Sequence, residues 1–251
     1  MDADPVRRNF LRAAPLLMVG LAGCVTPRRR EARLQAVAPF STATDLGRMA
    51  AGWEELVMRR DLPRTHYELN DWHGRRVLHA TGHGASGARC KVQVDPFAFP
   101  WVEWSWHIRD IPATLNVGRG ESDDSPARLA IAFDGDERKL AFRDRALYEF
   151  VELITGERLP YATLMYVWDG QLPVGAIANY SRTSRIRYLI VESGPARAGR
   201  WLRYRRNLLT DFRQVFGEEP GPIRSVGVVT DGDDLHVDLE SWYGDIRLVA
   251  T

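Results

Sequence analysis

The sequence predicts a mainly β protein whose strands form an antiparallel β-sandwich, with a jelly roll as one such arrangement. From Trp53 onward, short apolar runs alternate with groups of Gly, Pro, Asp and Ser, which is typical of many short strands joined by turns. Only two segments have helical periodicity, too few for a parallel α/β fold. No internal repeat is visible, so we expect residues 53–251 to form one β-sandwich domain with two amphipathic helices packed on it.

Eight segments combine β-branched or aromatic residues with flanking turn formers, and we predict each to be a strand. They are residues 75–80, 89–94, 101–108, 128–133, 162–168, 186–192, 225–230 and 242–249. Asp95-Pro96, Asp169-Gly170 and Asp231-Gly232 are among the turn signals that separate them. Sequential strands of this kind pair most readily with their neighbours, which favours antiparallel sheets.

Two segments are predicted to be helices, residues 139–154 and 201–216. The apolar positions are Leu140, Leu147, Phe150, Val151 and Ile154 in the first segment and Trp201, Tyr204, Leu208, Phe212, Val215 and Phe216 in the second. Their spacing places them on one side of a helix. A glycine that can end a helix follows each segment, Gly156 and Gly217.

The N-terminus resembles an export signal. Arg7-Arg8-Asn9-Phe10-Leu11-Arg12 is similar to a twin-arginine motif, and Leu21-Ala22-Gly23-Cys24 is similar to a bacterial lipobox. The apolar run between them, residues 13–22, is much shorter than the roughly 20 residues that span a bilayer. We therefore expect a signal peptide over residues 1–23, a lipid on Cys24 and a tether over residues 24–52. An amphipathic or buried N-terminal helix is the alternative.

This signal predicts a protein of the bacterial cell envelope that is held to the membrane by its N-terminal lipid and faces the periplasm. Without residues 1–23, 31 basic and 31 acidic side chains remain. That balance argues against nucleic acid as a partner, because phosphate binding needs a basic surplus or patch. With Cys24 assigned to the lipid, Cys90 is the one cysteine left, so an intramolecular disulfide is excluded and the core must provide the stability.

The strand at residues 101–108 carries the first candidate ligand-binding residues. Alternation places Val102, Trp104, Trp106 and Ile108 on a core face and Trp101, Glu103, Ser105 and His107 on the other. An indole beside a carboxylate and an imidazole can stack on a sugar and hydrogen-bond its hydroxyl groups. Trp101, Glu103 and His107 are therefore candidate glycan contacts. The alternative is an outer face covered by one of the helices.

Charged residues within the predicted strands are the second group of candidates. Arg128, Glu192 and Asp245 each lie in or at the end of an apolar segment, where a charge needs a partner. They could form a polar network with Glu103, which would either bind a ligand or serve the structure alone.

Acidic loops supply a candidate metal site. Residues 121–124 and 231–234 are both rich in carboxylates, and two such loops could hold Ca²⁺ through hard oxygen ligands. Asp231 and Asp233 are the candidate ligands. The spacing does not match the twelve-residue EF-hand loop, and a solvated turn is the alternative for each cluster.

Four blocks together resemble the bacterial domain-of-unknown-function family 3047. They are Asp123-Asp124-Ser125-Pro126-Ala127-Arg128, Leu159-Pro160-Tyr161-Ala162-Thr163-Leu164-Met165-Tyr166-Val167-Trp168-Asp169, Val191-Glu192-Ser193-Gly194 and Trp242-Tyr243-Gly244-Asp245-Ile246. The resemblance implies an often exported β-sandwich of a galactose-binding or jelly-roll kind, with no established activity and no catalytic residues to transfer. The family's Thr-Asp-Thr-Asp-Asn-Thr run is Thr-Asp-Gly-Asp-Asp-Leu at residues 230–235, so a site built on its Asn and Thr would be lost.

These observations favour an envelope lipoprotein that binds a glycan or another polar envelope ligand, with Ca²⁺ as a structural ion. The first alternative is a hydrolase or lyase acting on an envelope polysaccharide through two of Glu103, Glu192, Asp231 and Asp245. The second is a structural or assembly lipoprotein, which predicts a large exposed apolar patch. No HExxH, CxxC, GxSxG, Walker or GxGxxG motif occurs, so no catalytic residue is assigned.

Overall fold

The computed structural model describes residue 1, residues 37–58 and residues 61–250. The expected signal peptide, the lipidation site Cys24 and the first part of the expected tether lie outside the described residues. Residues 37–250 belong to one compact unit. Within the described part of the chain, no helix is both long and apolar enough to cross a bilayer.

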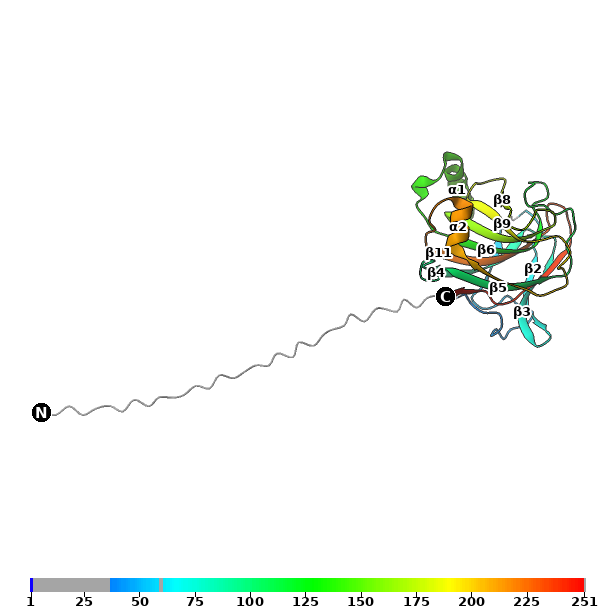
Figure 1. Cartoon of the computed structure of the whole chain (residues 1–251), viewed down its shortest axis with the longest axis horizontal. Helices are drawn as coiled ribbons and strands as arrows, with labels where there is room; N and C mark the ends of the chain where they lie inside the picture. The colour runs from blue at the N-terminus through cyan, green and yellow to red at the C-terminus, as the bar shows by residue number, and fades with distance from the viewer. Residues whose placement is uncertain (2–36, 59–60, 251) are drawn as a thin grey trace. The chain divides into compact units, whose positions relative to one another are not determined.

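The described residues form two facing sheets, as the fold class predicted (Figure 1). In spatial order, the seven-stranded sheet contains β1 (Glu54–Val57), β4 (Ser86–Val94), β11 (Ile223–Asp231), β6 (Ser125–Phe133), β7 (Ala162–Asp169), β9 (Ile186–Ser193) and β8 (Ile177–Asn179). The six-stranded sheet contains β10 (Leu202–Asn207), β5 (Trp101–Ile108), β12 (Leu239–Tyr243), β3 (Arg75–Gly82) and β2 (His66–Trp72), and β13 (Arg247–Val249) pairs with β5. The β7–β9 pair is parallel and the other pairs are antiparallel.

Aromatic residues from both sheets fill the core between them. Trp104 of β5 stacks on Tyr166 of β7, with ring centroids 5.0 Å apart, and Trp106 lies 6.5 Å from Trp168. The expected alternation along β5 is confirmed, because Val102, Trp104, Trp106 and Ile108 all belong to the core. This packing removes large aromatic surfaces from water and stabilises the sandwich.

The eight predicted strands all occur, but four short ones were missed: β1, β2, β8 and β10. β8 has only three residues, and β2 contains His66, Glu68, Asn70 and Asp71, which weaken the apolar signal. The predicted strand at residues 242–249 is also interrupted. Its chain leaves the sheet after Tyr243, where the Gly244 N–H donates to the Ser105 carbonyl at 2.9 Å, and resumes as β13.

The second predicted helix is only half correct. Residues 201–207 were expected to be helical, but Leu202–Asn207 is β10 and pairs with β5. The helix α2 begins at Leu208 because the Asn207 side chain accepts a hydrogen bond from the Thr210 N–H at 2.9 Å, which caps its first turn. It ends at Gly217 as expected. α2 packs through Phe212, whose ring lies 4.7 Å from Phe133 in the core.

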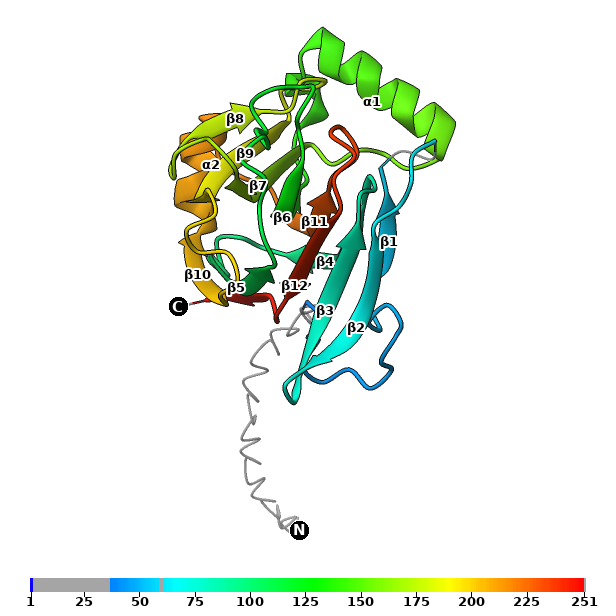
Figure 2. The same cartoon turned by 90° about the vertical axis from the view of Figure 1, so that its right-hand side faces the viewer.

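The first predicted helix is present as a 3₁₀ turn at Glu137–Lys139 followed by α1 (Phe142–Thr155), with Gly156 at its end. Figure 2 shows α1 beyond the ends of the strands. Its apolar side is therefore less buried than its periodicity implied. Four large side chains are exposed, at 86%, 59%, 84% and 57% of their surface: Phe142, Phe150, Leu153 and Ile154.

Residues 37–52, expected to belong to the tether, pack on the domain instead. Phe40 is buried and lies 4.7 Å from Trp53 between ring centroids. The Trp53 indole donates to the Ala38 carbonyl at 2.8 Å. The folded part of the chain therefore begins well before residue 53, because Val37, Phe40 and Ala50 of this segment belong to the core.

A buried carboxylate holds α1 to the loop before β9. Asp144 accepts hydrogen bonds from the Thr183 hydroxyl at 2.6 Å, the Ser184 hydroxyl at 2.6 Å and the Ser184 N–H at 3.2 Å. Burial would raise the pKa of Asp144, but the hydrogen bonds from Ser184 and Thr183 outweigh it and lower the pKa below 3.8.

We predict that Asp144→Ala lowers the free energy of unfolding by about 2 kcal/mol, because three donors lose their acceptor. The lowered pKa means that this stabilisation is present above about pH 4 and is lost as the pH falls through the folded-state value. Urea unfolding of both proteins from pH 7 to pH 3 measures the difference. Glu149→Gln, on the exposed side of the same helix, is the control. A difference that persists unchanged at pH 3 would contradict the assignment.

Candidate functional site

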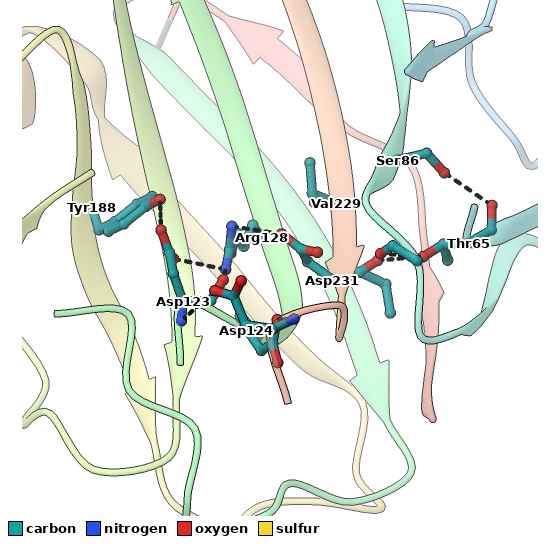
Figure 3. A network of polar contacts seen from close by, with 12 residues as sticks. Thr65, Ser86, Asp123, Asp124, Arg128, Tyr188, Val229 and Asp231 are labelled. Carbon is teal, nitrogen blue, oxygen red and sulfur yellow. Dashed lines mark hydrogen bonds and ion pairs between the residues drawn. The ribbon is translucent and has the colours of Figure 1, made fainter. Parts of the chain in front are cut away.

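A buried arginine lies at the centre of a polar network that joins the loop before β6 to the end of β11. Arg128 of β6 lies beside Val229 of β11 and Val167 of β7 and is 3% exposed. Its Nη2 donates to the Asp123 carbonyl at 2.6 Å and to Asp123 Oδ1 at 3.1 Å. Its Nη1 donates to Asp231 Oδ2 at 3.3 Å (Figure 3). The charge expected at Arg128 is thus balanced by two aspartates from opposite sides.

Asp123 is held from its other side by a tyrosine. The Tyr188 hydroxyl of β9 donates to Asp123 Oδ2 at 2.8 Å, and the Arg128 guanidinium lies 5.3 Å from the centre of the Tyr188 ring. Burial raises the pKa of Asp123 to about 6, although the charge of Arg128 and the Tyr188 hydrogen bond act in the opposite direction. The network therefore ties β6, β9 and β11 together on the outer face of their sheet.

Three carboxylates gather beside this network. Asp124, Asp231 and Asp233 each present an oxygen atom, and these atoms lie within 4.8 Å of one another. The Asp124 carboxylate accepts the N–H groups of Asp234 at 3.1 Å and Leu235 at 2.8 Å, which joins the loop before β6 to the turn after β11. The two aspartates expected to hold a metal are thus together, and the first acidic loop supplies a third.

Asp231 has an unsatisfied oxygen in this cluster. Its Oδ2 is bound to Arg128, whereas its Oδ1 is buried and accepts no hydrogen bond from the described residues. Burial raises its pKa well above the ordinary value; the charge of Arg128 lowers it and the neighbouring carboxyl group of Asp233 raises it.

A buried cluster of hydrogen bonds around Thr230, the residue before Asp231, connects the two sheets. The Thr230 N–H donates to the Tyr67 hydroxyl at 2.8 Å, and the Tyr67 hydroxyl donates to the Ser86 carbonyl at 2.9 Å. The Thr230 hydroxyl also lies 2.8 Å from the Tyr243 hydroxyl. All of these groups are buried. They satisfy the polar atoms of β11 inside the core and serve the structure.

A second candidate site is a cluster of aromatic side chains on the outer face of the six-stranded sheet. The Trp72 ring centroid lies 4.7 Å from that of Trp242, 5.9 Å from that of Trp201 and 4.8 Å from that of His107. His107 lies beside Trp242 in the pairing of β5 and β12. The three indoles are partly exposed.

Polar groups border these rings. The Arg75 guanidinium lies 4.8 Å from the centre of the Trp201 ring and donates to the Ser105 hydroxyl at 3.2 Å. His79 stacks on Trp242 at 4.9 Å and lies 2.9 Å from Glu240, which also binds Arg109 at 2.9 Å. Burial lowers the pKa of His107, which favours its neutral imidazole. Its Nδ1 is buried and has no partner among the described residues. We call the surface formed by Trp72, His107, Trp201 and Trp242 the aromatic face.

The sequence candidates of β5 lie along the same outer face. Trp101 and Glu103 are partly exposed, and Arg205 of β10 joins them. Its guanidinium lies 4.4 Å from the centre of the Trp101 ring and 3.2 Å from Glu103 Oε1. Trp101 and His107 are six residues apart on one strand, so they lie about 20 Å apart. The shared face of Trp101, Glu103 and His107 is the one that the alternation along β5 predicts.

The remaining candidates, Glu192 and Asp245, belong neither to the network around Arg128 nor to the aromatic face. Glu192 accepts hydrogen bonds from Arg197 at 2.7 Å and from the Tyr204 hydroxyl at 2.9 Å. Asp245 accepts the Ser41 N–H at 2.9 Å and the Ser41 hydroxyl at 2.6 Å. The expected network of Glu103, Arg128, Glu192 and Asp245 is therefore wrong. Each of the four binds different partners, some from segments whose packing the sequence did not reveal.

Trp72, Trp201, Trp242 and Arg75 were not selected from the sequence. The sequence pattern predicts no strand at β2, where Trp72 lies, and predicts a helix at residues 201–216, where Trp201 precedes β10. The available signal was the composition, because the chain has eight tryptophans. Neighbouring turns do not identify the exposed ones, since Trp168 precedes Asp169-Gly170 and is fully buried.

We predict that Arg128→Met lowers the free energy of unfolding by about 3–5 kcal/mol, because Asp123 and Asp231 would stay buried without their cation. Arg138→Met is the matched control. Arg138 also binds an aspartate, Asp136, but its side chain is 91% exposed and water screens the pair, so we expect no measurable change. Urea unfolding followed by tryptophan fluorescence compares the two variants. Equal losses would show that the buried network contributes no more than a surface pair.

Comparisons with known proteins give a family and two distant structural similarities. No curated protein matches the chain in sequence. The Clostridium thermocellum endo-1,4-β-D-xylanase 10B CBM22-1–GH10 modules, complexed with xylohexaose, are 11% identical with a TM-score of 0.33, over 84% of this chain and 28% of theirs. The family 11 xylanase from Neocallimastix patriciarum is 8% identical with a TM-score of 0.29, over 79% of this chain and 97% of its own. At these scores we take no function from either protein.

The family match covers most of the chain. The family described as "Protein of unknown function (DUF3047)" matches residues 51–247, which include β1 to β12, the aspartate cluster and the aromatic face. This is the family that the four sequence blocks resemble, and the chain therefore belongs to it.

Proposed function

We propose that the domain is a glycan-binding module and that the aromatic face is its binding surface. The observation that carries this proposal is the group of three partly exposed indoles, Trp72, Trp201 and Trp242, around the buried imidazole of His107. A sugar ring presents C–H groups that pack against an indole and hydroxyl groups around its edge. The aromatic face has indoles for the C–H groups, and polar side chains at its border for the hydroxyl groups.

The border of the aromatic face supports a polar rather than a purely apolar ligand. Arg75 and Arg109 can donate to hydroxyl oxygens, whereas Glu240 accepts from them. A ligand that hydrogen-bonds to Arg75, Arg109 and Glu240 while covering the indoles gains both apolar burial and hydrogen bonds.

The length of the face supports a chain of sugars rather than a single one. Trp101 and Glu103 lie on the same side of β5 as His107, about 20 Å away at the far end of the strand. Arg75 and Ser105 lie between the two ends. An extended oligosaccharide along β5 would reach both.

The hydrolase or lyase alternative has less support. Glycoside cleavage requires two carboxylates about 5–10 Å apart on either side of a bond. The four residues considered for that role each bind an arginine of their own: Glu103 binds Arg205, Glu192 binds Arg197, Asp231 binds Arg128 and Asp245 lies 3.7 Å from Arg247. A non-catalytic binding module is the simpler proposal.

A structural or assembly role is the second candidate. It is favoured by α1, which projects beyond the strands and exposes Phe142, Phe150, Leu153 and Ile154. Such a group of large apolar side chains is more than a scattering of single surface residues. This role is compatible with glycan binding, because α1 and the aromatic face belong to different parts of the domain.

We predict that Trp242→Ala and Trp72→Ala each weaken binding of a linear oligosaccharide at least tenfold. Isothermal titration with linear β-1,4-linked hexaoses of glucose and of N-acetylglucosamine measures this. Phe97→Ala is the control, since Phe97 is 53% exposed and lies outside the aromatic face. Binding that survives both tryptophan substitutions, or no binding to any of a panel of envelope glycans, would refute the proposal.

We also propose that this domain acts in the bacterial envelope, attached to the membrane through a lipid on Cys24. The sequence of residues 7–24 supports it. We predict that the full chain incorporates an alkyne-bearing fatty acid in a bacterial host and that Cys24→Ser abolishes incorporation. Cys90→Ser is the matched control, because Cys90 is buried in the core. Label retained in Cys24→Ser would exclude the anchor.

A further inference from the structure

We propose that Asp124, Asp231 and Asp233 bind a hard divalent cation, with Ca²⁺ as the best fit, at the junction of the loop before β6 and the turn after β11. The proposal is independent of glycan binding. It rests on the geometry of the three carboxylates and on the buried, unpartnered oxygen of Asp231.

The three oxygen atoms are already close enough to share one ion. Ca²⁺ binds oxygen ligands at 2.3–2.6 Å, so two ligands on opposite sides of it lie about 5 Å apart. The carboxylate oxygens lie within 4.8 Å of one another, which fits a single Ca²⁺ without movement of the backbone. Carboxylates are hard ligands, and they select Ca²⁺, Mg²⁺ or Mn²⁺ over the softer metals. Mg²⁺ requires shorter bonds and stricter geometry, which makes it the poorer fit.

The oxygen Asp231 Oδ1 is the observation that points to a ligand. Asp231 is only 6% exposed, and its Oδ2 is already used by Arg128. A buried acceptor without a donor costs free energy, and native proteins rarely leave one. A cation bound by this oxygen removes that cost and also relieves the repulsion between Asp231 and Asp233.

The charge around the cluster is strongly unbalanced. Five aspartates lie in the two joined segments, Asp123, Asp124, Asp231, Asp233 and Asp234. The positive charge of Arg128 faces this group, and Arg128 forms ion pairs with two of the five aspartates, Asp123 and Asp231. Asp124 and Asp233 therefore bring negative charge that Arg128 does not pair, which a divalent ion would neutralise.

A proton is the competing occupant. Asp231 and Asp233 are close enough to share one, and a shared proton would also supply a donor to the buried oxygen. The two occupants predict different behaviour at pH 7, because only the cation makes stability depend on added metal and on chelation. This difference decides the experiment.

The test uses the chelator-treated wild-type protein at pH 7 and titrates it with CaCl₂, MgCl₂ and MnCl₂ separately. We expect saturable binding of Ca²⁺ by isothermal titration, tighter than that of Mg²⁺. At a free Ca²⁺ concentration 100-fold above Kd, Tm should rise by about 5–10 °C. No heat and no change in Tm with any of the three metals would overturn the proposal and leave the shared proton.

Two substitutions in the same turn locate the site. Asp233→Asn should abolish the Ca²⁺-dependent rise in Tm and should still fold, because Asp233 is partly exposed and does not bind Arg128. Asp238→Asn should retain it, since that side chain is 79% exposed and binds His83. A Ca²⁺ response that persists in Asp233→Asn, or that is lost equally in Asp238→Asn, would contradict the assignment. None of these measurements involves a glycan, so failure of either proposal is recognised separately.

Discussion

The burial of Arg128 is the constraint on which the arrangement around the two acidic loops depends. A guanidinium that is 3% exposed must have partners, and the aspartates that serve it come from the loop before β6 and from the end of β11. Pairing with both fixes how these segments approach each other. The Asp124 carboxylate then closes the contact by accepting two N–H groups of the turn after β11. The meeting of Asp123 with Asp231 is a consequence of satisfying one buried positive charge.

The end of β11 connects this network with the rest of the sandwich. Alternation turns Thr230 into the core, where its N–H and hydroxyl group meet Tyr67 and Tyr243 from the six-stranded sheet, and turns Asp231 outward to Arg128. The chain then crosses from one sheet to the other and becomes β12, which carries Glu240 and Trp242. The cation site that we propose and the aromatic face are therefore separated by a single turn along the chain. Ordering of that turn by an ion would also restrain one strand of the surface that we propose for glycan binding.

The partly exposed tryptophans of the aromatic face differ from the tryptophans of the core. Three indoles that remain partly exposed, above a buried imidazole, leave apolar surface in water that the fold itself does not need to expose. The core shows what these side chains do when they serve stability alone: Trp104 and Trp106 are buried against aromatic residues of the facing sheet. The two faces of β5 therefore differ: one packs in the core, and the other carries the residues for which we propose binding.

The sequence by itself determined the fold class, eight of the strands and the two faces of β5, because the period-two pattern of a half-buried strand depends only on neighbours along the chain. It also identified Asp231, Asp233 and the acidic loop that supplies Asp124. Only the tertiary structure decided which charges meet. Arg128 pairs with Asp123 and Asp231, and Asp245 pairs with Ser41 across 204 positions. It also assembled Trp72, Trp201 and Trp242 from three strands or their ends. Contacts between distant segments depend on sheet order and register, and no local pattern encodes either.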